Sequence, residues 1–273
     1  MICISGCTDI RRTERTVNTI LSAISSFYRY HNQAGNTCVQ FSEPHYLPHN
    51  RHRSLLHHVF KDKPIWKRIV GLKTPKTIPK TISKEQMKIL LTSCHNLRDR
   101  FLLALLHETG LRIGQALALR HCDIKSWDNE IQVIYRKHNP NQVNNKNRLP
   151  NIVHVSQDLM RLYADYLNTH LVGADEQDYV FINTTNNQAL TYDATRKIFK
   201  RLSKNTGIFI TPHMLRHTHA TELIRQGWDA ALVQKRLGHA NVETTINIYT
   251  HINDQDLKKA FQCYQDKINK EPK

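Results

Sequence analysis

The chain has 273 residues, of which 40% are apolar and only nine each are Gly or Pro. This is enough apolar material for one large or two modest domains, and it excludes a disordered tail or a collagen-like repeat. Lys and Arg outnumber Asp and Glu by 39 to 23, a net charge of +16, which indicates a polyanionic partner. No apolar run approaches the ~18 residues of a membrane span, and the first residues do not form a secretory signal, so we expect a soluble cytoplasmic protein.

The six cysteines are scattered and form no C-x-x-C pair, which suits a reducing compartment. Cys3 and Cys7 have only the distant His52, His57 and His58 as further potential ligands. Zinc sites of structural type use two close ligand pairs, so a metal here is a weak alternative. We expect neither a metal nor another cofactor.

The front of the chain carries the densest charge. Residues 1–80 hold 13 Lys or Arg against four Asp or Glu. Within 1–60, apolar residues at helical spacing predict one helix over 16–30 and a second short helix over 54–60. Residues 61–80 are rich in Lys, Arg and Pro, which predicts an extended linker. We therefore predict a helical domain over 1–60, a basic linker over 61–80 and a second domain over 81–273.

The second domain is predicted to be mainly helical with a small antiparallel sheet. Ser83 and Gln86 form a capping-box signature, and Gly110 closes an apolar helix over 99–107. Another helix begins at Arg112. Short strands are predicted over 124–125, 131–136 and 152–155. Further helices are predicted over 156–171, 191–205, 211–226, 229–237, 241–249 and, as an amphipathic tail, 253–268.

Five segments combine basic or nucleophilic residues with tight local structure: TGLRIGQAL at 109–117, NNKNRLP at 144–150, TPHMLRHTHA at 211–220, KRLGHANVETT at 235–245 and INIYTH at 246–251. In their order and spacing they resemble the motifs of the tyrosine recombinases, the phage integrase-like enzymes. The resemblance covers about residues 77–265 and is greatest for the recombinases of transposons and integrative elements. It implies a tyrosine recombinase catalytic domain, preceded here by a short and apparently truncated helical DNA-binding domain.

Arginine is suited to holding a phosphate, because its planar guanidinium donates two hydrogen bonds to two oxygens and stays charged. Arg112 follows Gly110 at a helix start, and His213 and Arg216 are three residues apart on one helix face. The resemblance implies that Arg112 and Arg216 clamp the scissile phosphate. It also implies that His213 and His239 bind this phosphate or transfer protons.

The resemblance makes Tyr249 the nucleophile. A phenol with a pKa of ~10 needs nearby cations and a proton acceptor, for which His213 is the first candidate. The product is a 3′-phosphotyrosyl link, which a DNA hydroxyl can attack without metal or ATP. Lys146 is expected to protonate the leaving 5′-oxygen, with Lys137 and Arg148 as the alternatives.

The chain departs from the family pattern at three places. Gln115 stands where a carboxylate is usual, and His154 replaces the usual proline. The short front of the chain motivates the hypothesis of weak DNA binding and impaired recombination. His217 and His219 are assigned to packing or to support of the site rather than to catalysis.

The expected partners are double-stranded DNA and further copies of the chain. The family commonly docks the tail that follows the tyrosine on the next subunit of a tetramer around synapsed DNA sites. The face of the predicted tail that carries Leu257, Ala260, Phe261 and Tyr264 suits this contact. We expect a nucleoid-associated enzyme that acts in DNA integration or transposition.

Other classes of function remain open from the sequence. A DNA-binding remnant without activity explains the charge but gives no reason for Tyr249 ten residues after His239. A type IB topoisomerase shares the residues and the tyrosine chemistry. A metal-dependent nuclease needs paired carboxylates, whereas Asp and Glu are dispersed here. A zinc cluster of His213, His217 and His219 lacks the glutamate of the H-E-x-x-H motif.

Overall fold

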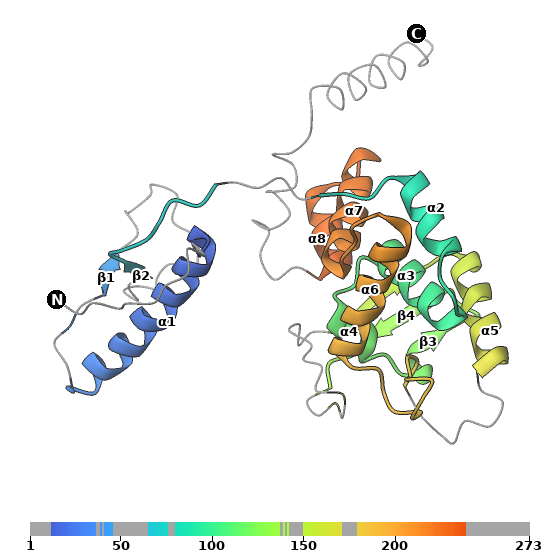
Figure 1. Cartoon of the computed structure of the whole chain (residues 1–273), viewed down its shortest axis with the longest axis horizontal. Helices are drawn as coiled ribbons and strands as arrows, with labels where there is room; N and C mark the ends of the chain where they lie inside the picture. Colours follow the sequence, from blue (N-terminus) through green and yellow to red (C-terminus); the bar gives the residue numbers. More distant parts are fainter. Residues whose placement is uncertain are drawn as a thin grey trace, which may run out of the picture. The chain divides into compact units, whose positions relative to one another are not determined.

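The computed structural model describes residues 12–36, 39, 41–45, 65–75, 80–136, 139, 141, 150–170 and 179–238. The chain divides into two compact units, Met1–Thr77 (unit 1) and Ile78–Lys273 (unit 2). Both are drawn in Figure 1. The boundary between the units falls inside the predicted basic linker.

Unit 1 contains one long helix and a two-stranded ribbon. Helix α1 (Glu14–Gln33) begins after Thr13, whose side chain accepts a hydrogen bond from the Thr16 amide at 3.3 Å. Strands β1 (Ser42–His45) and β2 (Ile65–Arg68) pair antiparallel. The predicted helix over 54–60 lies outside the described residues.

The ribbon changes the prediction for the linker. Residues 65–68 are extended, as predicted, but they belong to unit 1 because they pair with β1. The segment that follows is also fastened to α1, since the Asn18 side chain exchanges two hydrogen bonds of 2.8 and 2.9 Å with the Leu72 backbone. Short strands without alternating hydrophobicity leave little signal in a sequence, so pattern reading missed them.

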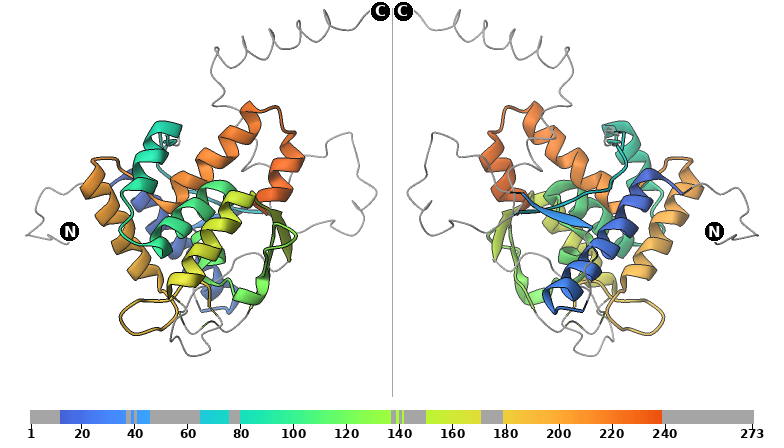
Figure 2. Two further views of the ribbon diagram at one scale, coloured as in Figure 1. Left: turned by 90° about the vertical axis from the view of Figure 1, so that its right-hand side faces the viewer. Right: turned by 90° about the vertical axis from the view of Figure 1, so that its left-hand side faces the viewer.

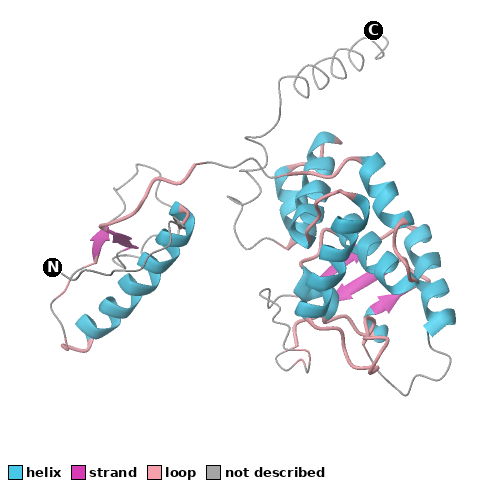
Figure 3. Ribbon diagram, in the orientation of Figure 1, coloured by secondary structure: helices cyan, strands magenta, loops and turns pink. Residues whose placement is uncertain are grey.

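Unit 2 is mainly helical with one small antiparallel sheet, as predicted (Figure 3). Its helices are α2 (Lys84–Thr92), α3 (Leu97–Thr109), α4 (Ile113–Leu117), α5 (Gln157–His170), α6 (Tyr192–Thr206), α7 (Pro212–Arg225) and α8 (Ala230–Leu237). A short 3₁₀ helix, η1 (His121–Asp123), leads into strands β3 (Ile124–Lys125), β4 (Glu130–Val133) and β5 (Asn151–His154).

Side-chain caps explain where several of these helices begin. The Ser83 hydroxyl accepts from the Gln86 amide at 3.2 Å, and the Gln86 side chain accepts from the Ser83 amide at 3.0 Å. This is the capping box that the sequence predicts. Thr191 and Thr211 cap α6 and α7 more simply, each accepting one hydrogen bond from a backbone amide through its side-chain oxygen.

Helix α3 is the centre of unit 2 and packs against α2, α4, α5 and α7. It is apolar on nearly all sides, as expected of a helix surrounded by others, and Phe101 and Leu105 are fully buried. The Phe101 ring lies 5.3 to 6.1 Å from three aromatic rings of α5 and the segment after it, Tyr163, Tyr166 and Phe181. A second, smaller apolar cluster forms where α7 meets α8.

The sheet has the order β3-β4-β5, with Ile131 of β4 opposite Val153 of β5. Figure 2 shows it at one edge of the helices of unit 2. Strand β5 contacts α8. The contact links the sheet to the predicted site, because α8 ends at Gly238, directly before the predicted site residue His239.

The helices predicted over 241–249 and 253–268 lie outside the described residues. Among the helices that the structure does describe, none is both long and apolar enough to cross a membrane.

Gly110 ends α3 in the left-handed conformation, with φ of 63°. A Cβ atom at this position would lie 2.6 Å from Leu237 Cδ2 and 2.8 Å from His219 Cδ2. We therefore expect Gly110→Ala to lose about 1 kcal/mol through backbone strain and about 1–3 kcal/mol more through overpacking, measured by urea unfolding.

Gly207 provides the matched control, because it has φ of 68° but no atom within 4 Å of the added Cβ. Gly207→Ala should lose only the strain contribution, about 1 kcal/mol. Equal losses for the two variants would contradict the close packing at Gly110.

Candidate active site

The turn after α3 places Arg112. Gly110 reverses the chain, and Arg112 is the residue at which α4 begins, as predicted. The Arg112 amide donates to Gln115 Oε1 at 2.9 Å. Gln115 is buried. Its amide oxygen accepts this hydrogen bond without adding the negative charge that a carboxylate would bring.

Helix α7 places His213 and Arg216. It begins at Thr211-Pro212, where proline suits the first turn. Only 4% of the Arg216 surface is exposed, and its guanidinium donates to the carbonyls of Gly110, at 2.7 Å, and Leu237, at 2.8 Å. The side chain therefore connects the end of α3 to the end of α8.

Arg112 is held at the same place. Its Nη1 donates to the carbonyl of Gly238 at 3.3 Å, next to the carbonyl that Arg216 uses. The last turn of α8 thus accepts hydrogen bonds from both arginines. Carbonyl oxygens at a helix end carry partial negative charge, which offsets part of the repulsion between the two cations.

Burial and charge shift the acidities of these groups. Burial lowers the pKa of Arg216 to about 9, with a further contribution from the Arg112 charge. Burial also lowers the pKa of Arg112. Both remain protonated at neutral pH. The pKa of His213 is lowered by burial and by the charges of Arg216 and Arg112, so its imidazole is neutral and able to accept a proton.

The three histidines of α7 do not act as one cluster. His213 and His217 are in contact, with their Nε2 atoms 3.0 Å apart. His219 lies elsewhere: it is buried, and its Nε2 accepts from Arg236 Nε at 3.1 Å. A zinc site that joins all three is therefore wrong.

Arg112, His213 and Arg216 line one cavity of about 410 Å³, together with Leu111, Ile113, Tyr192, Thr211 and Pro212. The structure thus brings together three of the six predicted site residues, although Arg112 lies 101 and 104 positions before His213 and Arg216 in the chain. Two cations and a neutral imidazole at one cavity are suited to bind a phosphate and accept a proton. Lys146, His239 and Tyr249, with the alternatives Lys137 and Arg148, lie outside the described residues.

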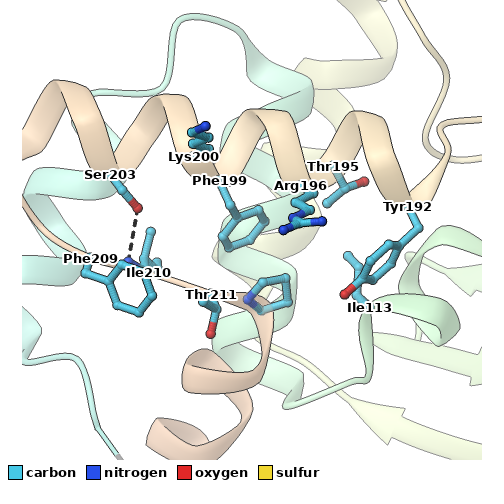
Figure 4. A pocket seen from close by; sticks show the side chains of 11 residues that line it. Ile113, Tyr192, Thr195, Arg196, Phe199, Lys200, Ser203, Phe209, Ile210 and Thr211 are labelled. Atoms are coloured by element: carbon cyan, nitrogen blue, oxygen red, sulfur yellow. Dashed lines mark hydrogen bonds between the residues drawn. The ribbon is translucent and has the colours of Figure 1, made fainter. Parts of the chain in front are cut away.

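A second cavity adjoins the first one. It has a volume of about 470 Å³ and shares Ile113, Tyr192, Thr211 and Pro212 with it. Figure 4 shows the side chains of Phe199 and Arg196 reaching from α6 toward the segment before α7. We call this second cavity the α6 groove.

Sequence reasoning missed Arg236. It lies in the last turn of α8 and binds groups of α3, β5 and α7. The only signal in the sequence is a cation directly before Leu237-Gly238, and nothing local reveals its distant partners.

The phage integrase family matches residues 80–256. Transposase A from transposon Tn554 of Staphylococcus aureus is 42% identical over 259 residues, which span 93% of this chain and 70% of the relative. Tyrosine recombinase XerC of Chlamydia caviae is 33% identical and is aligned over 91% of this chain and 70% of its own.

Solved structures agree in fold. A crystal structure of XerA recombinase is similar over 71% of this chain and 66% of its own, with a TM-score of 0.57 and 28% identity. The Tn1549 transposon integrase, solved with transposon right end DNA, is similar over 93% of this chain and 80% of its own, with a TM-score of 0.62 and 16% identity.

The chain belongs to the phage integrase family and is a tyrosine recombinase, an enzyme that transfers DNA strands. The similarity to a transposase places it among the enzymes of DNA recombination, integration and transposition.

His219 should make stability depend on pH. Burial and the neighbouring Arg236 lower its pKa to about 3, whereas an unfolded histidine titrates near 6.5. Between these values the unfolded chain binds the extra proton, so stability is full above about pH 6.5 and falls as the pH drops toward 3. We expect this residue alone to contribute about 1.4 kcal/mol per pH unit below 6.5.

The measurement is urea unfolding of the wild type and of His219→Phe between pH 7.5 and 5.0. The variant lacks the titrating group, so the stability difference between the two proteins should shrink as the pH falls. A difference that stays constant over this range would contradict a neutral, buried His219.

Proposed function

We propose that the chain is a site-specific recombinase that cleaves and rejoins DNA through a 3′-phosphotyrosyl intermediate. The observation that carries this proposal is the cavity shared by Arg112, His213 and Arg216. A phosphate bound there would meet two fixed cations, which stabilise the charge that its oxygens gain in the transition state. Three N–H groups of Arg216 have no partner among the described residues and are available for phosphate oxygens.

Tyr249 is the proposed nucleophile. Its phenolic oxygen forms a bond to phosphorus while the bond from phosphorus to the 5′-oxygen breaks. The phenolic proton passes to neutral His213, and Lys146 protonates the leaving oxygen. His239 follows Gly238 directly in the chain, so the Arg112 contact to the Gly238 carbonyl supports its assignment to the same phosphate. The intermediate retains the phosphodiester energy, and the proposed reaction therefore uses neither metal nor ATP.

Double-stranded DNA is the proposed substrate. Outside the α6 groove, helix α6 carries the exposed cations Lys197, Arg201 and Lys204, against one acidic residue, Asp193. Such a face suits contacts to the phosphate backbone, which provide much of the affinity of DNA-binding proteins. Solved relatives bound to transposon end DNA and to the difH substrate support the same partner. An enzyme acting on chromosomal DNA would be associated with the nucleoid in the cytoplasm.

We test the reaction with a suicide duplex that carries a nick a short distance to the 3′ side of the cleavage site, so that the short fragment with the freed 5′-hydroxyl diffuses away and the strand cannot be rejoined. The wild type should form a covalent protein–DNA adduct that survives denaturing electrophoresis. Tyr249→Phe should form none, because phenylalanine has no nucleophilic oxygen. Chelator should leave the adduct unchanged.

Four results would separate the alternatives. An adduct that persists in Tyr249→Phe contradicts the assigned nucleophile, and chelator sensitivity favours a metal-dependent nuclease. Binding without any adduct favours an inactive DNA-binding remnant. Relaxation of supercoiled DNA by a monomer, with no requirement for a defined site, favours a topoisomerase.

We further propose a homotetramer on two synapsed DNA sites, in which the tail of each copy docks on its neighbour. The α6 groove is the proposed acceptor. It is largely apolar, and two aromatic side chains at it, Tyr192 and Phe209, are 55% and 64% exposed. The predicted tail helix has a complementary apolar face with Leu257 and Phe261.

Phe209→Asp should reduce assembly on DNA about as much as deletion of residues 253–273, measured by gel shift and light scattering. The matched control is Trp127→Asp, since Trp127 is 98% exposed on the turn before β4, away from the groove. Mixing the tail deletion with Phe209→Asp should give no more than partial assembly. Unchanged assembly of both single variants would contradict tail exchange through this groove.

A further inference from the structure

Both clamp arginines, Arg112 and Arg216, rest on the last turn of α8. Their guanidinium groups donate to the carbonyls of Leu237 and Gly238. The position of these two carbonyls therefore fixes the position of the charges that would hold the phosphate.

Arg236 fastens this turn to two other elements. Its Nη2 donates to the carbonyl of Glu108, at 3.2 Å, and to the carbonyl of His154, at 3.1 Å. Its own carbonyl accepts from the Asn151 side chain at 3.1 Å. These bonds connect α8 to the end of α3 and to strand β5, directly before Leu237.

His219 provides the third attachment. Its Nε2 accepts from Arg236 Nε at 3.1 Å, which requires the unprotonated form of this nitrogen. Its ring also packs against Gly110, where an added Cβ would lie 2.8 Å from Cδ2. The carbonyl of Gly110 is the other acceptor of Arg216, so His219 contacts one end of the Arg216 anchor directly and reaches the other through Arg236, the residue before Leu237.

We propose that His219 and Arg236 are a positioning pair, whose contact holds in place the backbone carbonyls that carry the two clamp arginines. Arg236 does not line the cavity that Arg112, His213 and Arg216 share, and its Nε and Nη2 atoms donate to His219 and to the carbonyls of Glu108 and His154. It acts through the turn that follows it. This inference rests on the proposed function of the cavity.

The contact requires a hydrogen-bond donor at residue 236 and an uncharged acceptor at residue 219. Arg236 needs a neutral acceptor in a buried place, and burial together with the Arg236 charge keeps the pKa of His219 low. Phenylalanine at 219 would fill the space but leave a buried N–H without a partner, which is costly. Glutamine at 219 would keep an acceptor oxygen.

The experiment measures adduct formation on the nicked suicide duplex at saturating DNA, together with DNA affinity and thermal unfolding of each variant. Arg236→Gln should slow adduct formation about tenfold or more, as expected when a catalytic group is displaced by a fraction of an ångström. Lys235→Gln is the matched control, because it removes the same charge from the exposed neighbouring residue. Both variants should lose similar DNA affinity, and only Arg236→Gln should lose rate.

The histidine variants test the contact itself. His219→Phe should slow adduct formation as Arg236→Gln does, and His219→Gln should restore most of the rate. A purely structural role would change the unfolding temperature without changing the rate of the folded, DNA-bound protein.

The outcomes separate the two proposals. If the wild type forms the adduct and Arg236→Gln forms it at the same rate, the proposal of a positioning pair is overturned, whereas the proposed function stands. A rate that His219→Gln fails to restore overturns the positioning pair as well. No adduct from the wild type overturns the proposed function and, with it, the catalytic role of the pair.

Discussion

The site depends on one constraint, the burial of a charged guanidinium. Arg216 is removed from water, and a buried charge is stable only when it is well hydrogen-bonded. Its partners are two backbone carbonyls at the ends of α3 and α8, not carboxylates. The positive charge is therefore held without being neutralised, which is the state required to bind a phosphate. Gln115 has a similar effect at Arg112, because it accepts a hydrogen bond from the Arg112 amide without adding a negative charge.

Much of the local structure could be predicted from the sequence. The capping box at Ser83, the left-handed Gly110 and the proline start of α7 are local signals, and the structure has all three. The spacing of His213 and Arg216 places them on one helix face. The sequence patterns therefore sufficed for the mainly helical fold and for the residues of α7 that reach the cavity.

The remaining features depend on contacts between distant residues. The partner carbonyls of Arg216 are 106 and 21 positions away, and the backbone groups that Arg236 binds lie up to 128 positions away. No periodicity encodes such pairs, which is why Arg236 was missed. The ribbon of β1 and β2 was missed for a related reason, since its pairing is non-local and its strands do not alternate. The division of the chain into two functional domains at residues 61–80 stays a prediction. In the structure, β2 lies within this range and belongs to unit 1.

The central claim is that Arg216 acts on the charge of the scissile phosphate and not only on the fold. It is tested most directly with a duplex in which a methylphosphonate, which is uncharged, replaces that phosphate. Arg216→Ala should slow adduct formation strongly on the normal duplex and far less on the methylphosphonate duplex, relative to the wild type. Equal losses on both duplexes would contradict the account, because a structural defect alone affects the two substrates alike.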